Sequence, residues 1–240
     1  NQQKQKEKMT YNMTLNWILF FLIACTVQVQ SRDKTDENKI FKLSKSEKKE
    51  NFRFLFDGSS MDNWVGNKTE YVLEDGCIVM RPQQNIGGNL YTKDSFDNFV
   101  LRFEFMLTPE ANNGLGIRHQ TMDDKNYQGM ELQILDNEAP VYADLKPYQY
   151  HGSLYGYAPA RRGFLKKTGE WNQQEVIADG SRIKITLNGE VILDTDINEV
   201  TKDIPAEKIQ KGLLNKNGRI AFLGHGSVVK FRNIRIKEIR

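Results

Sequence analysis

Alternation of apolar and polar residues recurs along most of the chain after residue 52, and this two-residue period restricts the fold more than any other feature. In FVLRFEFML (99–107) every odd position is apolar, and Arg102 and Glu104 fall on the opposite face. Such a period is typical of a half-buried β-strand. The segment RIKITLNGEVIL (182–193) adds two runs joined by Asn188-Gly189, a pair that favours a tight hairpin turn.

Other short runs extend this pattern to the rest of the domain. Strands are expected at 53–56, 71–73, 77–81, 89–92, 115–118, 129–137 and 171–178. The segment 219–239 is expected to form a hairpin across Gly224-His225-Gly226-Ser227, followed by a long final strand. The only expected helix is short, near 200–209. About a dozen strands with turn signals at short intervals predict an all-β sandwich or jelly roll of two antiparallel sheets.

The first 25 residues have the pattern of an export signal. The run LNWILFFLIA (15–24) follows three lysines and is too short to cross a bilayer, which takes about 20 apolar residues. It ends in Leu22-Ile23-Ala24-Cys25, which resembles a bacterial lipobox, so residues 1–25 are expected to be a lipoprotein signal with Cys25 as the lipidated residue. The alternative is an ordinary signal peptide cleaved near Gln30-Ser31. Either form predicts an exported protein.

Residues 26–50 are polar and charged and are expected to be a tether, which leaves residues 51–240 as one globular domain. The positive charge of the chain belongs to its N-terminal part. Residues 1–50 carry 10 Lys and Arg against 6 Asp and Glu, whereas the remainder carries 24 against 25. A domain without a basic surplus gives no support to nucleic-acid binding. The second cysteine, Cys77, lies in an apolar run and is expected to be a buried, inert thiol.

Several polar residues stand where strand alternation places them outside the core. In GLGIRHQ (114–120) Arg118 should share the outward face with Gly116, and in GMELQILDN (129–137) the outward residues are Glu131 and Gln133. The segment KPYQYHGSLYG (146–156) places three tyrosines beside a histidine. Aromatic and hydrogen-bonding side chains together are typical of carbohydrate sites.

Each of these residues also has a purely structural interpretation. Arg118 and Glu131 would form an ion pair between adjacent strands, His151 would cap a loop, and His225 would belong to a turn. The tyrosines of 146–156, Tyr148, Tyr150 and Tyr155, would pack at the edge of the sandwich. The three histidines of the chain, His119, His151 and His225, each lie in an unusual segment, which is a weak signal in itself.

The order Glu131-x-Gln133-x-x-Asp136 resembles the E-x-D-x-x-E strand motif of laminarinase-type retaining glycosidases, with an amide in place of the middle acid. Retaining hydrolysis needs two carboxyl groups about 5–5.5 Å apart. On a regular strand, positions 131 and 136 are about 16 Å apart and face opposite ways. The sequence therefore disfavours a two-carboxylate mechanism and makes Asp136 a turn residue at the end of the strand.

About four-fifths of the chain resembles the 3-keto-disaccharide hydrolase domain family. The resemblance includes FLFDGSSMDNW (54–64), FVLRFEFMLTPEANNGLGIR (99–118), GMELQILDN (129–137), YQYHGSLYG (148–156) and GHGSVVKFRNIRIKE (224–238). It implies a concanavalin A-like β-sandwich and a glycoside substrate whose sugar carries a ketone at C3. It also implies functional coupling to a sugar C3 oxidoreductase. With Cys25, it implies a periplasmic or outer-membrane lipoprotein of a Gram-negative bacterium.

A C3 ketone acidifies the hydrogen on C2, so one general base and a stabiliser of the enolate oxygen are sufficient for cleavage. The resemblance then implies Glu131 or His151 as base and Arg118 as stabiliser. The residues expected to bind the sugar are Gln133, Tyr150, Tyr155, His119 and His225, with Tyr155 as donor to the leaving oxygen. A divalent metal held by Glu131 and a histidine is an alternative electrophile, and no organic cofactor is expected. Two other functions stay open: a conventional glycosidase on unoxidised glucans, and a carbohydrate-binding module without catalysis.

Overall fold

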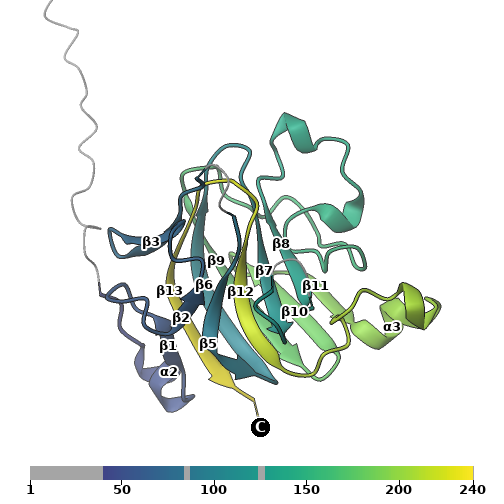
Figure 1. Cartoon of the computed structure of the whole chain (residues 1–240), viewed down its shortest axis with the longest axis horizontal. Coiled ribbons are helices and arrows are strands. Elements are labelled where there is room, and N and C mark those ends of the chain that lie inside the picture. The colour runs from purple at the N-terminus through teal and green to yellow at the C-terminus, as the bar shows by residue number, and fades with distance from the viewer. Residues whose placement is uncertain (1–39, 84–86, 124–127, 240) are drawn as a thin grey trace, which may run out of the picture. The chain divides into compact units, whose positions relative to one another are not determined.

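The computed structural model describes residues 40–83, 87–123 and 128–239. The described part is almost entirely strand, and its two sheets pack face to face (Figure 1). The eight-stranded sheet has the order β11-β10-β9-β6-β13-β4-β3, with β1 also paired to β13. The five-stranded sheet has the order β2-β5-β12-β7-β8. All pairs are antiparallel, which confirms the predicted two-sheet sandwich of the concanavalin A-like class.

The strands of the eight-stranded sheet are β1 (Arg53–Phe56), β3 (Tyr71–Glu74), β4 (Cys77–Met80), β6 (Phe99–Leu107), β9 (Trp171–Asp179), β10 (Arg182–Leu187), β11 (Glu190–Asp196) and β13 (Val229–Glu238). Those of the five-stranded sheet are β2 (Trp64–Gly66), β5 (Leu90–Phe96), β7 (Asn112–His119), β8 (Met130–Leu135) and β12 (Gly218–Gly224). The helices are α2 (Lys45–Lys49), α3 (Ile197–Thr201) and the 3₁₀ turns η1 (Pro140–Tyr142), η2 (Pro147–Gln149) and η3 (Ala206–Lys208).

The core forms between the sheets from the apolar residues that the alternation places inward. On β6 these are Phe99, Leu101, Phe103, Phe105 and Leu107, all buried, and they contact inward residues of the five-stranded sheet. The rings of Phe222 and Phe231 stack across the sandwich with centroids 3.7 Å apart. Cys77 is buried and carries a free thiol, as expected.

The turn at Gly224–Ser227 does not form the predicted hairpin. Its two flanking strands, β12 and β13, belong to different sheets, so the turn carries the chain across the edge of the sandwich. Both strands present an inward phenylalanine, and the pair packs through the core rather than through backbone hydrogen bonds. A turn signal in a sequence marks where the chain reverses, but not whether the reversed strand pairs or crosses.

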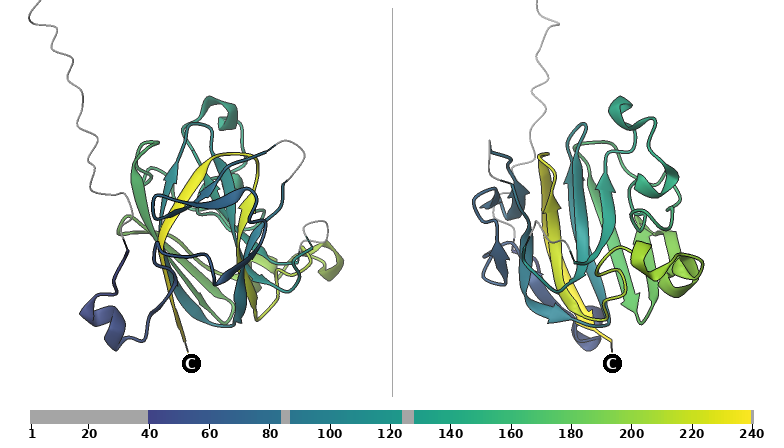
Figure 2. Two further views of the ribbon diagram at one scale, coloured as in Figure 1. Left: turned by 60° about the vertical axis from the view of Figure 1, so that its left-hand side comes forward. Right: turned by 45° about the vertical axis from the view of Figure 1, so that its right-hand side comes forward.

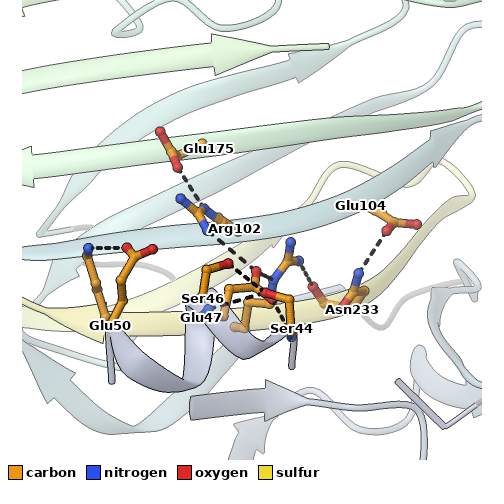
Figure 3. A network of polar contacts seen from close by, with 10 residues as sticks. Ser44, Ser46, Glu47, Glu50, Arg102, Glu104, Glu175 and Asn233 are labelled. Atoms are coloured by element: carbon orange, nitrogen blue, oxygen red, sulfur yellow. Dashed lines mark hydrogen bonds and ion pairs between the residues drawn. The ribbon is translucent and has the colours of Figure 1, made fainter. Parts of the chain in front are cut away.

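Helix α2 lies within the segment that the sequence predicts to be a tether, and it is fixed to the eight-stranded sheet. Ser44 caps the helix, and Glu47 pairs with Arg235 at 2.5 Å and with Arg102 at 3.4 Å (Figure 3). Arg102 in turn pairs with Glu175 at 2.7 Å. A local charge count cannot distinguish a free tether from a charged segment that meets complementary charges on a sheet. The expected helix near 200–209 is present only as α3, which ends before Pro205, and as the turn η3.

The long connection from β8 to β9 contains η1 and η2 and projects beyond the ends of the strands (Figures 1 and 2). Part of it returns to the edge of β8, where backbone hydrogen bonds join Gly152 and Tyr155 to Gln133 and Glu131. This connection therefore covers the free edge of the five-stranded sheet, beside the residues that the sequence singled out.

Candidate functional site

Glu131 lies on the outer face of the five-stranded sheet, as the alternation predicts. Its neighbours Met130 and Leu132 on β8 are fully buried in the core, whereas the side chain of Glu131 retains 16% exposure. Its carboxylate folds over the adjacent strand β7 at Gly114. A Cβ atom at Gly114 would lie less than 3.0 Å from the Glu131 Oε1 atom, so this glycine provides the space for the carboxylate.

His225 contacts this carboxylate from the turn after β12. Its Nε2 atom lies 3.4 Å from Oε1 of Glu131, and its side chain is 43% exposed. The structure thus brings together two residues more than ninety positions apart in the sequence. A carboxylate beside an imidazole, with one of the two open to solvent, is an arrangement suited to proton transfer.

His119 lies on the same outer face, over two further glycines. Cβ atoms at Gly116 or Gly129 would lie less than 3.0 Å from its imidazole ring. The ring meets Tyr91 edge-on with centroids 5.8 Å apart. Burial lowers the pKa of His119 to about 4, so the imidazole is uncharged at neutral pH.

Leu223 lies between the glycine covered by Glu131 and the glycine covered by His119. Its methyl groups lie within about 3 Å of where Cβ atoms of Gly114 and Gly116 would stand. Leu223 also forms a small cluster with Tyr91 and Ala221 that is separate from the main core. The outer face therefore carries, around Leu223, one carboxylate, two imidazoles and one phenol, and we refer to Tyr91, His119, Glu131, Leu223 and His225 as the outer-face site.

Arg118 is not part of the outer-face site, contrary to the prediction. Its guanidinium donates to the carbonyls of Asp97, Gly180 and Asn215 and to Oδ1 of Asn98. It borders a different cavity of about 500 Å³. The reason is an irregularity in β7. The backbone of Arg118 has φ +55, and the register against β12 shifts at this point, which redirects Arg118 and places His119 outward instead.

His151 lies between the two sheets rather than on the outer face. It is 1% exposed, its ring stacks on Phe105 at 5.1 Å, and its Nε2 lies 3.0 Å from Oε1 of Gln174. Its Nδ1 accepts the backbone N–H of Leu135 at 3.4 Å. Burial lowers its pKa to about 4, against a smaller rise from the bond to Gln174. A group enclosed in this way does not reach a substrate on the outer face.

The other predicted binding residues lie along the edge of β8. The Tyr155 hydroxyl accepts from Nε2 of Gln149 at 2.8 Å, and its backbone N–H donates to the Glu131 carbonyl. The Tyr150 hydroxyl donates to backbone carbonyls of Tyr142 and Ala143, so its polar end is engaged within the loop.

Gln133 is 4% exposed, and its Oε1 accepts the backbone N–H of Ile134. Asp136 accepts the backbone N–H of Glu110 at 3.0 Å, which makes it a turn residue as expected.

Tyr91 and Leu223 are the members of the site that sequence reasoning missed. The signal available for them was the pair Gly114 and Gly116, which lie two residues apart on one face of a strand. Glycine weakens a strand interior unless another group must approach the backbone closely. Two such glycines on one face indicate that neighbouring side chains lie across the strand, and here those are Glu131, His119 and Leu223.

Within the described residues, no three His, Cys, Asp or Glu side chains come close enough together to bind a metal ion. In the same part of the chain, no helix has the length and apolar character needed to cross a membrane.

The fold and the outer-face site define a β-sandwich protein with a carboxylate and an imidazole in contact on the outer face of one sheet. The chain belongs to the family of 3-keto-alpha-glucoside-1,2-lyase-like domains, whose model matches residues 51–237. This match confirms the family expected from the sequence.

A 3-keto-disaccharide hydrolase of Bacteroides thetaiotaomicron is 28% identical, with an alignment that covers 77% of each chain. Two crystal structures of Parabacteroides distasonis proteins, each named provisionally as a glycosyl hydrolase, have a similar fold. The first is 26% identical with a TM-score of 0.68 and covers 78% of this chain and 99% of its own. The second is 22% identical with a TM-score of 0.73 and covers 84% and 100%.

Proposed function

We propose that this protein cleaves the glycosidic bond of 3-keto-glycosides by elimination across C1 and C2, followed by hydration. The observation that carries the proposal is the Glu131 carboxylate on the outer face, 3.4 Å from His225, in a chain of this family. A single base is sufficient for this chemistry because the C3 ketone already makes the C2 hydrogen acidic.

Glu131 removes the proton from C2, and the electron pair of that C–H bond enters the C2–C3 enolate. The enolate then expels the substituent oxygen at C1, which gives an enone and an alcohol once that oxygen is protonated. His225, in its protonated form, is placed to supply that proton and to offset the negative charge of the enolate. Water then adds to the enone and yields the free 3-keto sugar. His225 thus takes the stabilising role that the family resemblance implied for Arg118.

The remaining residues of the site, His119, Tyr91 and Leu223, are at most 3% exposed, so they support Glu131 and His225 and do not contact the sugar as the sequence predicted for His119. His119 is uncharged at neutral pH, so it adds no positive charge to the site. Gln133 and Tyr155, which line the β8 edge, remain predicted contacts for sugar hydroxyls.

The decisive experiment compares Glu131→Gln with Asp136→Asn on a 3-keto-glucoside. We expect Glu131→Gln to lower kcat by about 10²–10⁴-fold, the usual contribution of a general base, while the circular dichroism spectrum is unchanged. Asp136→Asn keeps an oxygen acceptor for Glu110 and should retain activity. Undiminished turnover by Glu131→Gln would remove this residue from the mechanism.

The substrates in the same assay distinguish the alternatives. A conventional glycosidase would hydrolyse laminarin and would depend on a second carboxylate. A binding module would show saturable binding without turnover and would tolerate Glu131→Gln. Parallel reactions with and without a chelator show whether a divalent metal takes part.

The cellular setting forms part of the same proposal. We propose that the protein is exported as a lipoprotein through Cys25 and acts after a sugar C3 oxidoreductase has produced its substrate. Residues 1–39 lie outside the described part of the chain. Labelling with a lipid precursor, compared with Cys25→Ser, would test the anchor.

A further inference from the structure

Asn89 lies just before β5 and forms side-chain hydrogen bonds to two parts of the outer-face site. Its Oδ1 accepts the backbone N–H of Gly224 at 3.0 Å, and its Nδ2 donates to the Tyr91 hydroxyl at 3.0 Å. Gly224 ends β12 and directly precedes His225. One carboxamide is therefore bonded to Tyr91 and to the backbone that carries the histidine.

The orientation of this amide is determined by its partners. A backbone N–H is only a donor, so the Gly224 amide must face the oxygen of the Asn89 side chain. The nitrogen must then face Tyr91, whose hydroxyl oxygen accepts from it. Turning the amide by 180° would place its NH2 group against the Gly224 N–H and break that bond, so the bond to Gly224 sets the orientation of the amide.

The backbone of Asn89 is itself held firmly. Its carbonyl accepts the N–H of Asn67 at 2.9 Å, and a Cβ atom at Gly66 would lie 2.6 Å from that carbonyl. On the other side, a Cβ atom at Gly224 would lie 2.7 Å from the Gly88 carbonyl. The end of β12 is thus pressed against the Gly88-Asn89 backbone as well as bonded to the side chain.

His225 itself begins the turn that crosses between the sheets, and its side chain is 43% exposed. An exposed residue in a turn keeps a fixed side-chain position only if the backbone before it is anchored. Gly224 is that anchor point, and Asn89 is the side chain that holds it.

We propose that Asn89 is a positioning residue that fixes His225 against Glu131. This inference rests on the proposed function for its catalytic consequence, but the positioning itself is measurable without turnover. Asn89 acts through Gly224 and does not need to touch the sugar.

The first experiment is a double-mutant comparison by NMR. The chain has three histidines, so the ring signals of His225 are assigned by their loss in His225→Asn. In the wild type, Glu131→Gln should move the His225 ring resonances, because the two groups are in contact. In an Asn89→Ala or Asn89→Leu background the same substitution should move them little. Leu has the same number of side-chain heavy atoms as Asn and the same branching at Cγ, so it fills the site without hydrogen bonds if the alanine variant folds poorly.

Two control variants distinguish the hydrogen bond from Asn89 to Gly224 from the one to Tyr91. Asn89→Asp retains an oxygen for the Gly224 N–H and should preserve the response of His225 to Glu131→Gln. Tyr91→Phe removes the other branch and should preserve it too. An equal response in wild-type and Asn89→Leu backgrounds would overturn the proposal.

The kinetic counterpart uses a 3-keto-glucoside. Asn89→Leu should lower kcat by up to about 100-fold, the scale of a misplacement of about 1 Å, with a much smaller change in KM. Asn89→Asp should recover much of that loss. If the wild type does not cleave a 3-keto-glucoside, the proposed function fails, whereas the NMR comparison still decides whether Asn89 positions His225.

Discussion

His151 shows how a residue with catalytic chemistry becomes a structural one. Its Nδ1 accepts the Leu135 N–H, so the proton of the neutral ring must sit on Nε2, where it donates to the oxygen of Gln174. The depressed pKa keeps this tautomer uncharged. Both ring nitrogens are therefore satisfied inside the sandwich, and the imidazole links β8 to β9.

The same substitution at two histidines should therefore have opposite effects. His151→Asn should destabilise the fold by about 1–3 kcal/mol, because buried partners lose their hydrogen bonds, and should leave kcat nearly unchanged. His225→Asn should leave stability nearly unchanged and reduce kcat. Urea unfolding and steady-state kinetics at a temperature where both variants are folded measure the two effects. A folded His151→Asn protein without activity would contradict this assignment.

The sequence predicted the strands that carry the candidate residues, but not in every case the face of the sheet to which their side chains point. Glu131 was placed correctly because β8 is regular between Met130 and Leu135. Arg118 was placed wrongly because a single positive φ in β7 reverses the alternation from that point. His119, which the same alternation would place inward, reaches the outer face for this reason. Local irregularities of this kind leave no mark in the apolar pattern.

At the scale of elements, β7 is the strand that determines the shape of the site. It lies between β12 and β8, and its outward positions after Asn112 are the glycines Gly114 and Gly116. These glycines have no side chain to pack, so they weaken the strand, but they leave space for side chains of the neighbouring strands to lie across it.

Alanine at each glycine should consequently displace a different group. Gly114→Ala would push the Glu131 carboxylate away and should lower kcat on the order of 100-fold, because the base loses its geometry. Gly116→Ala would displace His119, a buried neutral ring that takes no part in proton transfer, and should lower kcat much less. Neither glycine has a positive φ, so alanine adds no backbone strain there. Kinetics of both variants on one keto-glucoside test the assignment, and equal kcat losses would contradict it.

Alternation and turn signals predicted the strand content and the two-sheet class, but they did not predict which strands pair with each other. The run 182–193 pairs as the hairpin β10-β11, as its Asn188-Gly189 turn indicates. The equally strong turn at 224–227 instead joins two sheets. In both cases the strands are apolar on one face, but β12 pairs with β5 and β7 and β13 pairs with β6 and β4, so Phe222 and Phe231 meet across the core.

For the whole molecule, the buried histidines predict a fall in stability with mild acid. His119 and His151 have folded pKa values of about 4, below the ordinary value of 6.5. The unfolded chain therefore binds protons that the folded chain does not as the pH falls from about 6.5 to 4. Each histidine should then lower the free energy of unfolding by roughly 1.4 kcal/mol per pH unit over that range. Urea unfolding of the wild type and of His151→Asn between pH 7 and pH 4 measures the slope, which should be smaller in the variant.

Glu47 predicts a second, more acidic loss of stability that arises on the opposite side of the sandwich. Burial raises its pKa, but hydrogen bonds from Arg235 and Ser44 and the charge of Arg235 outweigh this and lower the pKa to about 2 (Figure 3). The carboxylate is therefore stabilised in the folded state at every pH above its ordinary value of 4.5. That stabilisation should disappear as the pH falls from 4.5 towards 2.

Glu47→Gln tests this docking of α2 on the eight-stranded sheet. At pH 7 the variant should be less stable by on the order of 2–3 kcal/mol, because Arg235 and Arg102 lose their common carboxylate. The difference between wild type and variant should shrink as the pH falls from 4.5 towards 2, where the wild-type carboxylate also becomes neutral. The histidines titrate alike in both proteins, so their contribution cancels in the difference. Urea unfolding of both proteins along this pH series provides the measurement. A difference that stays constant with pH would show that Glu47 acts through packing rather than through its charge.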